Sequence, residues 1–97
     1  MKKLLTCAAA FAVALGISAA SASAQEKLKA CWVYVGAIGD FGYSYQHNEG
    51  RLAVVKELGD KVQTVFVENV AEADSERAIE RLARDGCAII FTTSFGF

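Results

Sequence analysis

A carboxylate with aromatic residues next to it in the sequence follows the apolar run over 31–35. Asp40 can accept hydrogen bonds from a sugar hydroxyl, an amine or a base N–H, and the loop around it contains no lysine to attract a phosphate. Phe41, Tyr43 and Tyr45 add aromatic faces. Such faces give a planar ligand contact area while neighbouring polar groups orient it. Each ring also has a simpler interpretation, packing in the core, and both stay open here.

Two later apolar runs also end in polar or aromatic residues. Glu68 and Asn69 follow one of them, and Ser94 and Phe95 follow the other. Because the carboxyl ends of parallel strands meet at one edge of a sheet, we expect these residues beside the first loop. Asn69 and Ser94 would orient a ligand and Phe95 would stack on it. Glu68 stands where a dinucleotide-binding fold places its ribose-binding acid, although capping or solvent exposure explains it equally well.

The sequence predicts no catalytic, metal or cofactor site. His47 is the single histidine, and no Cys, Asp or Glu accompanies it at a metal-ligand spacing. We find no nucleophile with a plausible base. We therefore expect His47 to stabilise the loop or to contact a ligand. The glycines of the first loop read G-x-x-G-x-x-G, which is not the dinucleotide fingerprint.

The hydrophobic pattern predicts an α/β fold in the order β-α-β-α-β, with parallel strands and helices on the sheet faces. We expect strands over 28–35, 62–67 and 88–92, and helices from Gly42 or Tyr43 to Leu58 and from Asp74 or Ser75 to about 85. Apolar spacing predicts that the first helix buries one stripe, formed by Tyr45, Leu52, Val55 and Leu58.

The N-terminal quarter has the pattern of a secretory signal peptide. Two lysines precede an apolar run over 4–20, and the small residues 21–24 follow it. We expect cleavage after Ala24, so that residues 1–24 are removed and 25–97 form one unit. A membrane-anchoring helix is the alternative. The net charge of -1 suggests neither nucleic acid nor an anionic membrane surface as a partner.

Two cysteines follow the predicted signal peptide. Cys31 and Cys87 each lie near the start of a predicted strand. They could pair in an oxidising compartment. We favour instead two small buried hydrophobic side chains, because the sequence does not show the Cα separation that a disulfide needs.

Three motifs together resemble the basic membrane protein family of ABC-transporter substrate-binding proteins: 36–51, 67–70 and 90–97. The match covers essentially all of 25–97. The resemblance implies a type I periplasmic binding fold, with two α/β lobes joined by a hinge and the ligand trapped between them. Characterised members bind purine nucleosides or related compounds.

By this resemblance, the first loop contributes an aromatic stack and a polar contact, and Ser94 and Phe95 contribute from the last loop. His47 and Asn69 match motif positions without an assigned role. The expected ligand-binding residues are Asp40, Phe41, Tyr43, His47, Asn69, Ser94 and Phe95.

The resemblance also leads us to expect a fragment of a longer protein, since the second lobe is missing and the fragment alone would bind weakly. No lipid-attachment cysteine is seen, which implies a soluble periplasmic protein. It would deliver a purine-like solute to a membrane permease through hinge closure, with no covalent chemistry. Two alternatives stay open: an oxidoreductase with a dinucleotide-binding fold, and a ligand-sensing domain of the same binding fold.

Overall fold

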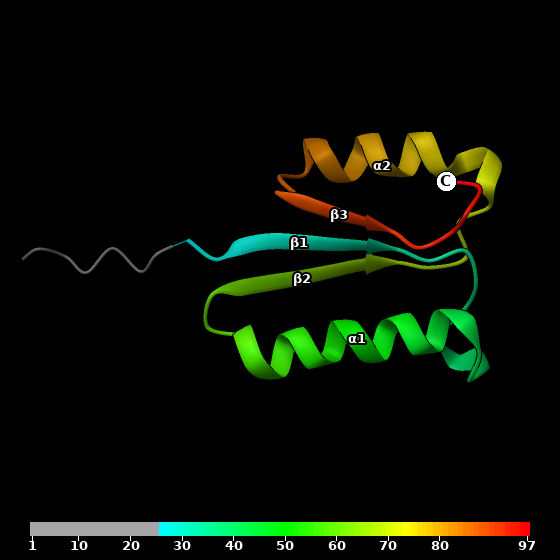
Figure 1. The fold of residues 1–97 in the computed structure, drawn as a ribbon. Coiled ribbons are helices and arrows are strands. Elements are labelled where there is room, and N and C mark those ends of the chain that lie inside the picture. The colour runs from blue at the N-terminus through cyan, green and yellow to red at the C-terminus, as the bar shows by residue number, and fades with distance from the viewer. Residues whose placement is uncertain (1–25) are drawn as a thin grey trace, which may run out of the picture.

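A parallel sheet lies between two helices in the computed structural model, which describes residues 26–97 (Figure 1). The predicted signal peptide lies outside the described residues. The elements are β1 (Leu28–Val33), η1 (Ile38–Asp40), α1 (Tyr43–Leu58), β2 (Val62–Val67), η2 (Glu72–Asp74), α2 (Ser75–Arg84) and β3 (Ile89–Thr92). The predicted β-α-β-α-β fold is thus confirmed. Among the described residues, no helix has the length and apolar character needed to cross a membrane.

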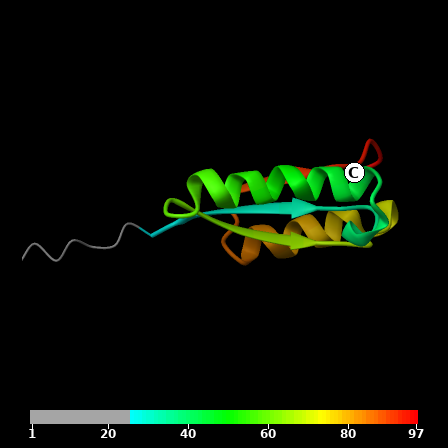
Figure 2. The same ribbon diagram turned by 90° about the horizontal axis from the view of Figure 1, so that it is seen from below.

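The strands run in the order β2-β1-β3, so β1 is central and pairs with both neighbours. Helices α1 and α2 lie on opposite faces of the sheet (Figures 1 and 2). Trp32 of β1 and Tyr34, just after the strand, lie towards α1, and Cys31 and Val33 of β1 lie towards α2. All four side chains are buried. Burial on both faces explains why β1 reads as an almost continuous apolar run.

The predicted apolar stripe of α1 is wrong. Leu52, Val55 and Leu58 are each 42–43% exposed, and the helix instead turns polar residues towards the sheet. The reason is the buried Tyr34 hydroxyl, which must find a partner inside the protein. It donates a hydrogen bond to Oδ1 of Asn48, over a distance of 3.3 Å.

Arg51 completes this polar contact between α1 and the sheet. Its guanidinium group donates to Oδ1 of Asn48 at 2.8 Å and to Oγ1 of Thr64 at 2.9 Å. It also lies over the ring of Phe66, 4.5 Å from the centroid. The sheet-facing side of α1 therefore combines the packing of Val54 against the core with hydrogen bonds and a cation–π contact.

The buried tyrosine makes stability depend on pH. Burial raises the pKa of Tyr34, and the nearby Arg51 guanidinium opposes this rise only in part. The pKa of Tyr34 is about 10 in the unfolded chain and higher in the folded protein. Its contribution to stability is therefore fully present below about pH 10 and is lost as the pH rises from there through the folded pKa. We expect the free energy of unfolding to fall more steeply above about pH 10 in the wild type than in Tyr34→Phe. Guanidinium titrations over this range check the expectation, with Tyr45→Phe as the control; equal slopes in all three proteins would contradict it.

Cys31 and Cys87 form a disulfide with a Cα–Cα distance of 5.9 Å, so the interpretation that we favoured, two unpaired cysteines, is wrong. The chain turns at Gly86, which has a φ of 93°. Cys87 then packs with the cluster on the α2 side of β1, the side towards which Cys31 points. The turn after α2 therefore supplies the short Cα separation that the sequence did not reveal.

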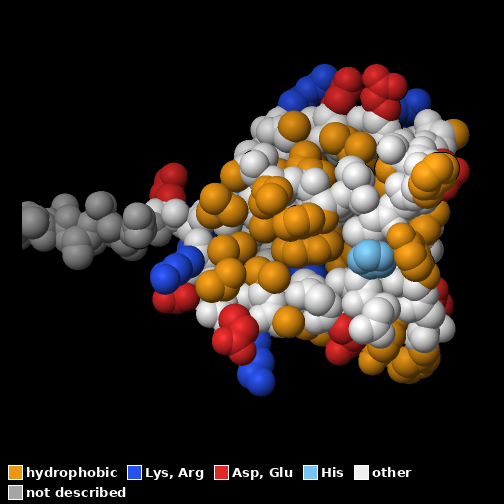
Figure 3. Space-filling model, in the orientation of Figure 1, with side chains coloured by type: hydrophobic (Ala, Val, Ile, Leu, Met, Phe, Trp, Pro, Cys, Tyr) orange, Lys and Arg blue, Asp and Glu red, His pale blue; other side chains and the backbone are white. Residues whose placement is uncertain are grey.

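Within residues 26–97, no helix covers the outer part of the sheet at β3. Helix α1 packs on β1 and β2, while Ile89 and Phe91 of β3 remain 43% and 41% exposed. Hydrophobic side chains gather on the corresponding side of the molecule (Figure 3). This exposed strip leads directly towards the loops at the carboxyl ends of the strands.

Candidate functional site

The loops after β1, β2 and β3 meet at one edge of the sheet, as the sequence predicts for parallel strands (Figure 1). Backbone hydrogen bonds join the first two loops: the Asn69 amide donates to the Gly36 carbonyl at 3.2 Å, and the Val70 amide donates to the Tyr34 carbonyl at 3.0 Å. The first loop reaches the third through the Tyr43 hydroxyl, which donates to the Thr93 carbonyl. The three loops therefore form one connected surface.

Side-chain oxygens fix the backbone of the first loop. Oδ1 of Asp40 accepts a hydrogen bond from the Gly42 amide at 2.7 Å, and Oγ of Ser44 accepts one from the Gly36 amide at 3.1 Å. Oε2 of Glu68 accepts another from the Ile38 amide at 2.9 Å. Glu68, whose position in the sequence matches that of a ribose-binding acid, thus holds the first loop in place. Oδ2 of Asp40 is left to accept a hydrogen bond from a ligand.

Phe41 stands out in this loop because its backbone is left-handed. Its φ is 54°, the side chain is 82% exposed, and the ring centroid lies 5.1 Å from that of Tyr45. A bulky residue in this region is strained, and such strain gathers at ligand-binding and active sites.

Replacement of Phe41 should reveal the strain. We expect Phe41→Gly to be more stable than Phe41→Ala by about 0.5–1 kcal/mol, because relief of the left-handed backbone exceeds the extra entropy that glycine gives the unfolded chain. Denaturant unfolding of the two variants measures the difference. A more stable alanine variant would show that this residue is not held in the left-handed region.

The third loop is anchored at its start and exposed at its tip. The Thr93 hydroxyl and amide both donate to the Val33 carbonyl, at 2.7 Å and 3.2 Å. The Phe97 amide donates to the Ser94 carbonyl at 3.2 Å, which closes a turn around Phe95. The ring of Phe95 is fully exposed, at 107%. A large apolar ring at the tip of an anchored turn is suited to contact a partner or a ligand.

Four of the expected site residues line one hollow: Tyr43, His47, Ser94 and Phe95. The rings of Tyr43 and His47 meet edge to face, with centroids 4.6 Å apart. Trp32 and Phe91 also line the hollow, although the sequence pattern gave no sign that they belong to the site. Their rings are stacked, with centroids 4.7 Å apart. Strand pairing brings them together, because Trp32 lies directly opposite Phe91 in the parallel register.

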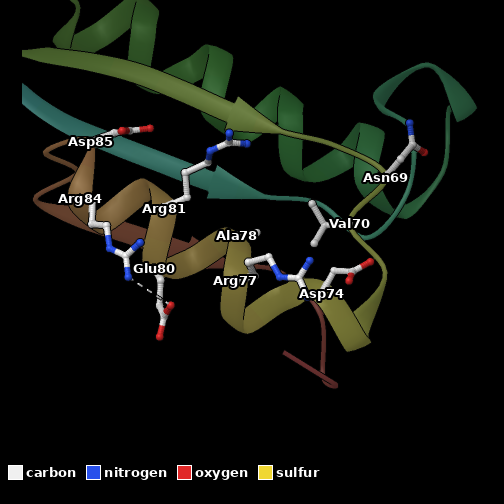
Figure 4. A pocket seen from close by; sticks show the side chains of 9 residues that line it. All are labelled: Asn69, Val70, Asp74, Arg77, Ala78, Glu80, Arg81, Arg84 and Asp85. Atoms are coloured by element: carbon white, nitrogen blue, oxygen red, sulfur yellow. Dashed lines mark ion pairs between the residues drawn. The ribbon is translucent and has the colours of Figure 1, made fainter.

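The remaining expected residues lie elsewhere. Asn69 lines a different hollow, between the loop after β2 and helix α2 (Figure 4). Its walls carry both signs of charge, including Arg77, Arg81 and Asp74. Asp40 and Phe41 line neither hollow, although their loop joins the third loop through Tyr43. The structure therefore separates Asn69 from the aromatic hollow that the other loops form.

The aromatic hollow offers flat apolar faces together with a hydroxyl and an imidazole. This combination suits a planar ligand with hydrogen-bonding groups at its edge. Within residues 26–97, no three His, Cys, Asp or Glu side chains gather in a way that could hold a metal ion. The arrangement can bind and orient a ligand through contacts and hydrogen bonds.

Comparison with known proteins agrees with this description. The profile of a family described as ABC transporter substrate-binding protein PnrA-like matches residues 27–97. A purine-binding protein of Brucella abortus is 58% identical over 78 residues, which are 79% of this chain and 22% of that protein. A putative ABC transporter glucose-binding protein of Haloferax volcanii is 41% identical over 75 residues, which are 77% of this chain and 19% of that protein.

The chain thus spans about a fifth of the length of these curated relatives. The family profile, in contrast, covers nearly all of the described residues, including all three loops of the site. Its description is that of a transport binding protein and names no chemical reaction. This chain belongs to the PnrA-like family of ABC transporter substrate-binding proteins.

Proposed function

We propose that the chain forms part of the first lobe of an extracytoplasmic receptor that binds a purine nucleoside or nucleobase and delivers it to an ABC permease. The observation that carries the proposal is Phe95, a fully exposed ring on an anchored turn at the carboxyl edge of the sheet. A purine offers the flat face that such a ring needs. The similarity to the purine-binding protein of Brucella abortus supports the same ligand class.

The polar groups of the loops favour a ligand that donates hydrogen bonds. Oδ2 of Asp40 is an acceptor, and Ser94 keeps acceptor capacity while its hydroxyl proton is donated to Glu72. Purine N–H groups and ribose hydroxyls provide matching donors. Closure of a second lobe over the ligand would bury the rings of Phe41 and Phe95 and exclude water, without a covalent step.

The disulfide supports an extracytoplasmic location. Disulfides persist in the periplasm and in secreted proteins and are rare in the reducing cytosol. The Cys31–Cys87 bond therefore agrees with export through the predicted signal peptide. In that compartment the direct partners of the protein would be the solute and the permease.

Titration calorimetry of the full-length gene product tests the ligand class. We expect saturable binding of adenosine or guanosine and none of glucose or NAD. Glucose is the sharpest control, because the relative from Haloferax volcanii is named as a glucose-binding protein. Binding of glucose without purines would overturn the proposal, and binding of NAD would favour the dinucleotide-binding alternative. Native mass spectrometry of protein purified from its own cell envelope would identify a co-purified ligand.

A further inference from the structure

The connector between β2 and α2 contacts the third loop through a single carboxylate. Oε1 of Glu72 accepts a hydrogen bond from the Ser94 hydroxyl at 2.9 Å. The same carboxylate lies against Gly96, where an added Cβ would collide with it. Glu72 thus contacts the turn on both sides of Phe95, the fully exposed ring.

The backbone that carries this carboxylate is itself fixed. Glu72 begins the short helix η2, and its carbonyl accepts hydrogen bonds from both the amide and the hydroxyl of Ser75, the latter at 2.8 Å. Ser75 is only 7% exposed. The Asp74 amide closes the turn by donating to the Ala71 carbonyl at 2.8 Å. The Glu72 side chain therefore extends from a rigid base.

The same connector also holds the first loop. Glu68 binds the Ile38 amide, and the Asn69 amide donates to the Gly36 carbonyl. Residues 68–75 thus touch both loops that carry exposed phenylalanines. The hydrogen bonds that the Glu68 and Glu72 carboxylates accept are charge-assisted, and such bonds are stronger than neutral ones.

We propose that Glu72 is a positioning residue that sets the direction of the Phe95 ring through Ser94 and Gly96. The proposal rests on the proposed function, in which Phe95 stacks on a purine. Without the carboxylate, the turn over 94–97 samples more conformations, and binding must then order it. Glu72 acts through the turn and needs no contact with the ligand.

Adenosine affinity of the full-length gene product tests this role. We expect Glu72→Ala to weaken binding about 5- to 10-fold, the scale of one charge-assisted hydrogen bond. Glu72→Gln should retain most of the affinity, because its amide oxygen still accepts from Ser94. Glu76→Ala is the matched control, since it removes an exposed carboxylate one turn further along and should leave the affinity unchanged.

Two further variants separate positioning from general destabilisation. Gly96→Ala keeps every charge but forces the Glu72 carboxylate away, so it should weaken binding as Glu72→Ala does. In a Ser94→Ala background, Glu72→Ala should weaken binding little further, because the hydrogen bond that it removes is already absent. Additive effects, or equal affinities of Glu72→Ala and Glu76→Ala, would overturn the proposal.

Amide hydrogen exchange gives a readout that needs no ligand. We expect faster exchange at Gly96 and Phe97 in Glu72→Ala than in the wild type or in Glu76→Ala. If the wild type bound no adenosine, the proposed function would fail, while this measurement would still decide whether Glu72 orders the turn. Unchanged exchange in Glu72→Ala would refute the positioning role.

Discussion

Loss of the Cys31–Cys87 disulfide is expected to lower the free energy of unfolding by about 4 kcal/mol, the value that loop-closure entropy gives for a separation of 56 residues. This loss is large compared with the total stability that the unit can have, because few side chains form its core. The buried hydrophobic residues among 26–97 are Ala30, Cys31, Trp32, Val33, Tyr34 and Leu82. A small core leaves little stability in reserve.

Guanidinium unfolding of the full-length gene product, with and without dithiothreitol, measures this effect. Fluorescence of Trp32, which is buried on the face of β1 opposite Cys31, follows the unfolding around this strand. The double variant Cys31→Ala/Cys87→Ala is the control, since its midpoint should not respond to the reductant. Equal midpoints of the wild type in both conditions would contradict the prediction.

The succession of strands and helices along the chain could be predicted, starting from β1, because β1 has a clear hydrophobic pattern. Its residues 30–33 are buried on both faces, so nearly every position is apolar. The same reasoning failed for α1, where hydrophobic spacing selected Leu52, Val55 and Leu58. The sheet-facing side of α1 carries Val54 together with Asn48, which accepts a hydrogen bond from the buried Tyr34 hydroxyl. Sequence spacing alone does not reveal this pairing.

The meeting of the three loops at one edge of the sheet could be predicted, but which loop residues share a hollow could not. Parallel strands bring their following loops to one edge whatever the side chains are, which explains why Tyr43, Ser94 and Phe95 can line the same hollow. Whether two loop residues share a hollow depends on backbone direction. Asn69 has a φ of 56° and lines the hollow beside α2, away from the aromatic one.

Phe95→Ala should have the largest effect on ligand affinity, weakening adenosine binding about 10- to 100-fold, because stacking of a base on an aromatic ring contributes about 1–3 kcal/mol. The thermal midpoint should hardly change. The ring is fully exposed, so its removal takes nothing from the core. This combination of lost affinity with intact stability distinguishes a ligand-contacting ring from a structural one.

Substitutions of graded shape show which property of the ring is used. Phe95→Tyr keeps the flat face and should bind adenosine nearly as well as the wild type, whereas Phe95→Leu keeps apolar area without the face and should resemble Phe95→Ala. Leu52→Ala removes a partly exposed apolar side chain from α1, away from the loops, and should leave the affinity unchanged. If Phe95→Leu bound as tightly as Phe95→Tyr, apolar burial alone would explain the contribution. The aromatic face, and with it the argument for a planar ligand, would then lose its support.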